Sequence, residues 1–333
     1  MPNSKDAHID VALTNISVAY MQEAKAFIAD KVFPVVPVTR QSDVFYMYDK
    51  GDFMRDEAQQ RGAATESAGG DYGVEAQDPY YCRVHAFHRD VSPHERANYD
   101  KPLDVDADST EFVSQKMIIR REMQWATKFF KADIWGKQYT GVALDADGQP
   151  AQPLQATQKA RWNYAASTPI ADITGAGVEM AGSTSFKPNT LVLSPYVFNA
   201  LKGHEDILDR IKYTQKGIVT TDLLATLFEV ENVYVAWAVV NSAAKNATDS
   251  VDFIMGKHAL LCYSNPNPGL RKPSAGYIFA WKGLEGSGAY GNRIVRLPMD
   301  SLGLGTERIE GEIAFDAKQI CADLGVFFKD IVD

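Results

Sequence analysis

The most regular hydrophobic pattern in the chain lies between about residues 109 and 137 (STEFVSQKMIIRREMQWATKFFKADIWGK). Its apolar side chains recur at the 3.6-residue period of an α-helix and form two adjacent stripes. The first stripe contains Phe112, Ile119, Met123, Ala126 and Phe130, and the second contains Ile118, Trp125 and Phe129. Asp106 and Asp108 precede the pattern as candidate N-caps, and Gly136 ends it. At 1.5 Å per residue this predicts a helix about 40 Å long, which would cross a whole domain.

Two strand-like runs flank a polar segment on the amino-terminal side of this helix. Asp43 to Asp49 (DVFYMYD) and Tyr80 to Val91 (YYCRVHAFHRDV) are rich in strand-forming residues, and the polar stretch AQQRGAATESAGGDYG between them contains four glycines. The pattern predicts a long hairpin with a mobile tip. Because an isolated two-stranded ribbon is marginally stable in water, we expect it to lie on its own domain or on a partner.

Residues 1–38 are predicted to be either an arm or the first helix of a domain. Val18 to Lys31 is only loosely periodic, and Pro34 and Pro37 favour an extended chain directly after it. Neither interpretation is favoured by the residues alone, because the segment has few apolar positions of its own to bury.

The remainder of the chain alternates short elements, which is typical of an α+β protein. Helices are predicted at about 169–181, 195–201, 205–211 and 221–228. Strands are predicted at Thr190 (TLVLS), 233–240, 251–255, 259–263, 277–281, 293–297 and 325–332, with a further candidate at 309–315.

Composition and charge narrow the class of protein. A chain of 333 residues with 45% hydrophobic and 23% charged residues is long enough for about two folded domains. Its net charge of -9 excludes an overall positive field for nucleic acid or an anionic membrane. The polar amino end and the absence of an apolar run of about 20 residues predict a soluble protein made in the cytosol.

The charge is distributed unevenly along the chain. Residues 40–108 contain eight basic and fifteen acidic side chains, so much of the acidity lies on or beside the predicted hairpin. The predicted long helix, in contrast, has six bases and three acids. Five bases fall roughly opposite its apolar stripes, namely Lys116, Arg120, Arg121, Lys128 and Lys131.

The residues that carry chemistry do not form a recognisable catalytic or cofactor site. Cys82, His85, His88 and His94 are the nearest approach to a metal cluster, but side chains three apart on a strand point to opposite faces. The glycines of GAGVEMAG lack the spacing of a phosphate-binding loop, and the three cysteines suggest neither a disulfide framework nor a zinc site. We therefore predict no enzyme activity, no metal and no cofactor.

The order of these elements resembles the major capsid proteins of tailed bacteriophages, which have the Hong Kong 97-like fold. The segment 187–238 (KPNTLVLSPYVFNALKGHEDILDRIKYTQKGIVTTDLLATLFEVENVYVAWA) is similar to the apical domain of that family. GYIFAWKGLEGSG followed by YGNRIVRLPM resembles the exit from this domain, and ICADLGVFFKDIV resembles the closing strand.

The resemblance implies a complete division of the chain. It implies an amino-terminal arm at 1–38, an E-loop at 39–92, a peripheral domain at 93–170 and 291–333 with a spine helix at about 109–137, and an apical domain at 171–290. In the E-loop, Phe45, Tyr46, Tyr48 and Phe53 would supply apolar contacts to the next subunit. The basic residues of the spine helix would face packaged DNA, or a scaffold before it, although a merely solvated helix face remains equally compatible.

The resemblance also implies function and partners. It implies self-assembly into hexamers and pentamers of an icosahedral head that encloses double-stranded DNA, with a portal protein and with a location in the virion. The predicted E-loop starts about 40 residues from Met1, which leaves no room for a cleaved scaffolding segment and predicts a separate scaffolding protein. A decoration protein is left open. Lys50 could cross-link to Asn292 as in some relatives, but we expect an ordinary solvated lysine.

Two alternatives are kept beside this interpretation. A prokaryotic nanocompartment shell has the same fold and would enclose an enzyme cargo in place of DNA. A soluble α+β enzyme of unrecognised mechanism is the alternative from another class, since catalytic groups can be assembled in space from distant residues.

Overall fold

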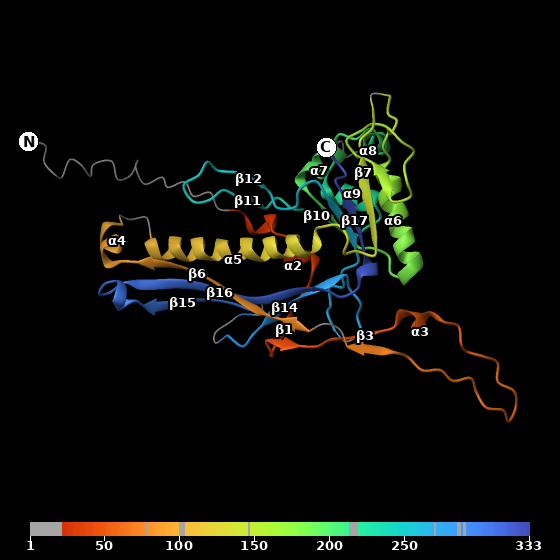
Figure 1. Cartoon of the computed structure of the whole chain (residues 1–333), viewed down its shortest axis with the longest axis horizontal. Coiled ribbons are helices and arrows are strands. Elements are labelled where there is room, and N and C mark those ends of the chain that lie inside the picture. The colour runs from red at the N-terminus through yellow and green to blue at the C-terminus, as the bar shows by residue number, and fades with distance from the viewer. Residues whose placement is uncertain are drawn as a thin grey trace, which may run out of the picture.

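The computed structural model shows an elongated molecule with a long helix lying lengthwise over a twisted sheet (Figure 1). It describes residues 22–76, 79–99, 104–145, 147–212, 219–269, 271–284, 288 and 291–333. The expected start of the arm, residues 1–21, lies outside the described residues. Of the predicted helix at 18–31, the described part contains η2 (Ala24–Ala26) and α2 (Ala29–Val32).

The long helix, α5, spans Val105–Phe129 and therefore starts and ends earlier than its sequence pattern predicted. Asp104 is its N-cap, because its side chain accepts the backbone N–H groups of Asp106 and Ala107. The buried face takes residues from both predicted stripes. Ala126 and Phe130 of the first stripe are buried, as are Trp125 and Phe129 of the second, whereas Phe112 of the first is 41% exposed.

A five-stranded sheet supports α5, with β16 at its centre. β16 (Glu307–Gln319) pairs along one edge with β14 (Gly276–Trp281) and then β15 (Asn292–Pro298), and along the other edge with β6 (Arg83–Val91). β1 (Val35–Val38) extends the sheet parallel to β14. Gly311 of β16 allows α5 to lie close, because a Cβ there would stand 2.5 Å from the side chain of Val113.

A six-stranded sheet forms the second layer, at one end of α5. Its order is β10 (Asn232–Val235), β9 (Thr190–Leu193), β13 (Ala259–Cys262), β17 (Gly325–Lys329), β7 (Lys137–Val142) and β8 (Gln158–Ala160). One face packs against the helices α6 (Pro169–Thr184), α7 (Pro195–Lys202), α8 (Glu205–Ile211) and α9 (Thr221–Leu227). The other face contributes Val192, Leu260 and Phe327 to a core shared with α5.

The sheets include segments from both sides of the predicted domain boundaries. β14, within the predicted apical range, belongs to the five-stranded sheet, and β17, within the predicted peripheral range, lies between β13 and β7. The two layers are therefore interwoven along the chain, and the same core residues hold them together.

The predicted hairpin is shorter than its sequence pattern suggested. β2 (Ser42–Asp43) pairs with β5 (Tyr80–Tyr81), and β3 (Tyr46–Tyr48) pairs with β4 (Val74–Ala76). The strand-like run after Cys82 leaves this ribbon and becomes β6 of the five-stranded sheet. A short helix, α3 (Lys50–Met54), follows β3, and the ribbon projects away from both sheets (Figure 1).

The remaining elements are short. They are α4 (Pro93–Asn98), the separate hairpin of β11 (Val239–Asn241) and β12 (Val251–Phe253), η3 (Asp300–Leu302) and η4 (Ala322–Leu324). Among the helices of the described residues, none combines the length and apolar character needed to cross a bilayer.

Candidate assembly surfaces

The end of the β3–β4 pair next to α3 carries a cluster of aromatic rings. Tyr48, Phe53 and Tyr72 lie with their ring centroids 5.6 to 5.9 Å apart. The guanidinium of Arg271 lies 5.4 Å from the Tyr48 ring. Phe53 is nevertheless 62% exposed, so this cluster fixes the position of the ring without burying it.

The four aromatic residues predicted as subunit contacts do not lie on one surface. Phe45 stacks on Phe279 of β14, at 6.1 Å between centroids, and so packs on its own sheet. Tyr48 lies within the aromatic cluster, where Arg271 covers it. Tyr46 and Phe53, exposed by 63% and 62%, are the two that present most of their surface to solvent.

Lys50, the candidate for cross-linking, forms an ion pair with Asp323 of the same chain. The pair joins the start of α3 to η4, and both side chains are about half exposed. The contact attaches the ribbon to the body of the molecule through an exposed pair that contributes little stability.

The five basic residues predicted on one helix face divide into two groups. Arg121 forms an ion pair with Asp30 at 3.0 Å, and Lys128 forms one with Asp316 at 2.6 Å. Lys116 and Arg120 are exposed and have no ion pair among the described residues, although the Lys116 ammonium lies 5.2 Å from the Phe112 ring. Lys131 is exposed beyond the end of α5, so Lys116 and Arg120 are the two of the five that are exposed on the helix itself.

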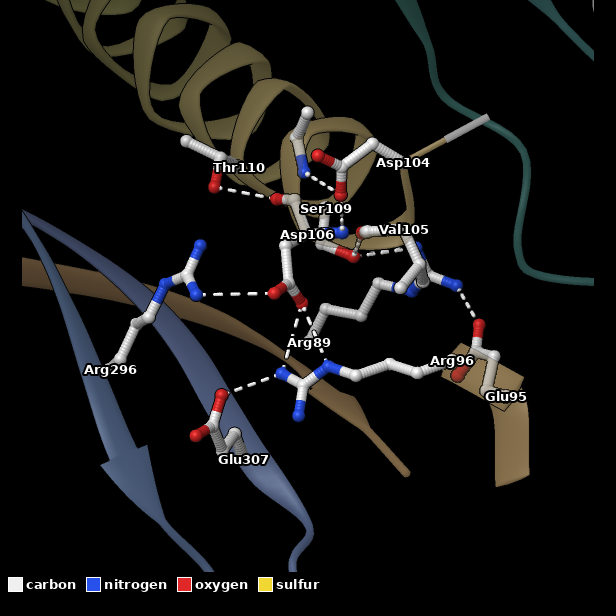
Figure 2. A network of polar contacts seen from close by, with 11 residues as sticks. Arg89, Glu95, Arg96, Asp104, Val105, Asp106, Ser109, Thr110, Arg296 and Glu307 are labelled. Carbon is white, nitrogen blue, oxygen red and sulfur yellow. Dashed lines mark hydrogen bonds and ion pairs between the residues drawn. The ribbon is translucent and has the colours of Figure 1, made fainter. Parts of the chain in front are cut away.

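A network of charged side chains lies at the end of the five-stranded sheet that is farthest from the six-stranded sheet (Figure 2). Asp106, in the first turn of α5, accepts hydrogen bonds from Arg96 of α4 at 2.9 Å and from Arg296 of β15 at 3.1 Å. Arg96 also donates to Glu307 of β16 at 2.6 Å. Arg89 of β6 joins Glu95 and Ser109 in the same region. The network attaches two helices to three strands of the sheet.

A buried carboxylate attaches the amino-terminal segment to α5. Glu122 is 1% exposed and accepts the backbone N–H groups of Ile28, at 3.1 Å, and Ala29, at 3.0 Å. These are two of the otherwise unpaired N–H groups at the start of α2. Burial raises the pKa of Glu122 to about 7, against the opposing effect of the two N–H donors and Arg121. No local sequence pattern indicated this contact, because donors and acceptor are about ninety residues apart.

The best arrangement for nucleophilic catalysis in the described chain is a serine and a histidine, and its geometry opposes that role. Ser167 Oγ lies 2.9 Å from His204 Nε2, and both residues are buried. His204 Nδ1 accepts the Asp206 N–H, so the ring proton is on Nε2, which donates to Ser167. Ser167 in turn donates to the Tyr164 carbonyl at 2.7 Å. The imidazole therefore cannot accept the serine proton.

Neither the cysteine thiols nor the candidate metal ligands of the described residues are arranged for chemistry. Burial raises the pKa of Cys82 and of Cys262 to about 12 and that of Cys321 to about 11, which disfavours the reactive thiolate. Among the described residues, no group of three or more His, Cys, Asp or Glu side chains is gathered as a metal site.

Comparison with known proteins identifies relatives over most of the chain. The model of the family described as phage major capsid protein E matches residues 103–273, which is 171 of 333 residues. The major capsid protein of Burkholderia phage BcepMu is 27% identical over 285 residues, covering 84% of this chain and 86% of that protein. The major capsid protein of Pseudomonas phage JBD67 is 26% identical over 344 residues, covering 97% of each.

Solved structures show the same fold. A phage-related protein from Bordetella bronchiseptica RB50 matches with a TM-score of 0.68 and 23% identity, over 93% of this chain and 94% of that one. The mature capsid of bacteriophage PhiM1 matches with a TM-score of 0.60 and 11% identity, over 95% of this chain and 89% of that one. At these identities the likeness establishes the Hong Kong 97-like fold of phage capsid proteins.

Proposed function

This chain belongs to the phage major capsid protein E family and is a phage major capsid protein, and we propose that its copies form the hexamers and pentamers of an icosahedral head enclosing double-stranded DNA. As a structural protein it acts by assembly into a multimeric shell, so its location is the virion. We infer synthesis in the cytoplasm of the host bacterium.

The exposed ring of Phe53 carries the assembly proposal. It is 62% exposed on a ribbon that projects away from both sheets, and Tyr46 of the same ribbon is 63% exposed. Exposed aromatic residues on a projecting element are typical of protein interfaces. The ribbon thus supplies the E-loop that lies on the next subunit. We assign residues 39–81 to it, because β6 pairs with β16 and is part of the sheet.

The two layers correspond to the two domains of the family. We assign α5 and the five-stranded sheet to the peripheral domain, with α5 as the spine helix, and the six-stranded sheet with α6 to α9 to the apical domain. Residues 1–34 are assigned to the arm, because β1 belongs to the five-stranded sheet, and Glu122 holds the described part of this arm on the spine helix.

The partners follow from the same assignment. Lys116, Arg120 and Lys131 are exposed, and we assign them to non-specific contacts with packaged DNA or with a separate scaffolding protein before it. A portal protein would occupy one vertex of the head, and a decoration protein on its outside remains a further candidate. Lys50 is proposed as a non-cross-linking residue, since Asp323 of its own chain is its partner.

Light scattering after size-exclusion chromatography, with negative-stain microscopy of the large fraction, tests the proposal on the purified chain. Closed shells, or hexamers and pentamers that close when a scaffold is co-expressed, are expected. A monomer or dimer that never assembles would contradict it. Shells that enclose an enzyme cargo in place of DNA would favour the nanocompartment, which the phage capsid relatives make the weaker alternative.

A further inference from the structure

The strand β6 is an open edge of the five-stranded sheet. It pairs with β16 over residues 83–91, and no other strand of the described chain pairs with its second edge. The exposed residues Val84, Ala86 and Phe87 lie along it. A strand of this length with unpaired backbone groups is a template for a further strand.

The helix α5 overhangs this open edge. A groove of about 510 Å³ runs between β6 and α5, and its apolar lining includes Val84, Ala86, Ile119 and Met123. Ile119 and Met123 are only partly buried, whereas Met117, directed towards β16, is 8% exposed. The helix therefore extends apolar side chains over a position where the next strand of the sheet would lie.

The charge of the groove is positive. Lys116 and Arg120 line it, both are exposed, and neither has an ion pair among the described residues. No carboxylate contributes to the lining. His85 also lines the groove, and its Nε2 is buried. Burial, and then the charge of Arg120, lowers the pKa of this histidine, so its ring is neutral near pH 7 and adds no charge.

We propose that this groove binds an extended acidic segment of a separate protein, which adds to β6 as the next strand. Backbone hydrogen bonds along β6 would fix its direction, and aliphatic side chains at alternate positions would lie beneath Ile119 and Met123. Carboxylates of the segment would pair with Lys116 and Arg120. The inference rests on the proposed function only in assigning this separate protein to the scaffold.

The described part of a second copy of the chain is a weaker match to the groove. Its longest described stretch outside helices and strands is residues 55–73, between α3 and β4. That stretch (RDEAQQRGAATESAGGDYG) is exposed and contains no Val, Leu, Ile, Met or Phe to enter an apolar groove. The ribbon strands beside it already pair with each other. Within the described residues, the chemistry of the groove is therefore better matched by a different chain.

Fluorescence anisotropy with the full chain tests the proposal. The probe is a labelled peptide of about seven residues in which valine and glutamate alternate, long enough to form one strand. A second probe replaces glutamate with lysine. We expect saturable binding of the acidic probe, and at least about tenfold weaker binding by the double variant K116E/R120E. The double variant should in turn prefer the lysine probe. Lys245→Glu, an exposed lysine of the β11–β12 hairpin region, is the matched control and should bind as the unchanged chain does.

A separate measurement tests whether the segment binds through backbone hydrogen bonds to β6. Methylation of alternate peptide nitrogens in the acidic probe should abolish binding, and the bound probe should slow hydrogen exchange of β6 amides. Equal binding of the acidic and lysine probes, no effect of K116E/R120E, or full binding of the methylated probe would each overturn it. A further outcome would assign the groove to a second copy instead. In that case the unchanged chain binds neither probe, and the variant K116E/R120E fails to form shells. Particle assembly by the unchanged chain is measured separately, so failure of the probe leaves the capsid function standing.

Discussion

The carboxylate of Glu122 lies 3.0 Å from the backbone nitrogen of Ala29 and connects the middle of α5 to the first turn of α2. The same oxygen and its neighbour also accept the Ile28 N–H. The Arg121–Asp30 ion pair, at 3.0 Å, lies on the adjacent positions of both elements. A single turn of α5 thus holds the amino-terminal segment with a buried contact and a partly exposed one.

Removal of this carboxylate should loosen the amino-terminal segment. Glu122→Ala leaves two buried N–H groups without an acceptor, and we expect a loss of about 2–3 kcal/mol in the free energy of unfolding. Glu122→Gln keeps one acceptor oxygen and should cost less. Urea unfolding measures the difference. Equal destabilisation by the two variants would show that the hydrogen bonds contribute nothing beyond packing.

The free energy of unfolding should depend on pH through the buried carboxyl group of Glu122. The pKa of Glu122 is raised from 4.5 to about 7 in the folded state, so folding favours its protonated form. Protonated Glu122 therefore contributes about 3 kcal/mol to the free energy of unfolding. This contribution is complete below about pH 4.5 and is lost as the pH rises through about 7. The stability of Glu122→Gln relative to the unchanged chain should therefore increase between pH 5 and 8 by about 2–3 kcal/mol. Parallel pH profiles of the two proteins would contradict this.

The charged network at the end of the sheet should depend on Asp106 more than on its neighbours. Asp106→Ala removes the acceptor of Arg96 and Arg296, and we expect about 1–2 kcal/mol of destabilisation, chiefly through the less exposed Arg96. Asp108→Ala is the matched control, because both residues lie in the first turn of α5. Faster hydrogen exchange in α4 should accompany only the Asp106 variant. Identical unfolding midpoints would assign the effect to the helix dipole alone.

Assembly should be more sensitive to Phe53 than folding is. Phe53→Ala should change the stability of the unassembled chain by less than about 1 kcal/mol, because the ring is 62% exposed. It should raise the concentration needed for shell formation about tenfold or more, measured by light scattering. Phe53→Tyr, which keeps the ring, should assemble normally. Unimpaired assembly of Phe53→Ala would remove this residue from the subunit interface.

Two glycines should respond in opposite directions to the same change. In β14, a Cβ at Gly276 would stand 2.2 Å from the Phe33 ring, so Gly276→Ala should destabilise by about 2–3 kcal/mol. In α6, a Cβ at Gly175 meets nothing within 4 Å, so Gly175→Ala should stabilise by about 0.5–1 kcal/mol. Thermal unfolding compares the two. Stabilising shifts in both variants would mean that the ring of Phe33 moves aside freely.

Assembled shells should remain free of covalent links through Lys50. Its ammonium forms an ion pair with Asp323 in the same chain, and it is a solvated lysine in every other respect. A denaturing gel of purified shells should show one band at 36.8 kDa. A ladder of multimers that disappears in Lys50→Arg would establish cross-linking.

Local patterns predicted the elements well and their ends less well. The period of α5 is a property of its own residues, so its existence was predictable, as were β9, α8 and the strand at β16. The helix ends at Phe129, where the Trp135 indole donates to the Phe129 carbonyl, a contact that the helical period does not indicate. β7, which starts at Lys137, was missed for the same reason: the predicted helix extended over its start.

Contacts between distant segments account for most of what the sequence did not reveal. The run from Tyr80 to Val91 has the composition of one strand, and only pairing with β2 and β16 divides it at Cys82. Glu122 was one of three acids on a basic helix, and nothing near it indicates the N–H groups it accepts. Tyr46 and Phe53 were predicted as contact residues, and their exposure keeps that prediction in place for experiment.

The order of strands along the chain constrains when the protein can fold during its synthesis. β16 is the central strand of one sheet, and β17 lies between β13 and β7 in the other. Both are translated after every other strand of their sheets, at residues 307–319 and 325–329. A chain still growing on the ribosome therefore has two open sheets and cannot present its finished surfaces to completed copies nearby. We therefore expect that polysomes translate many copies side by side without nucleating shells on unfinished chains.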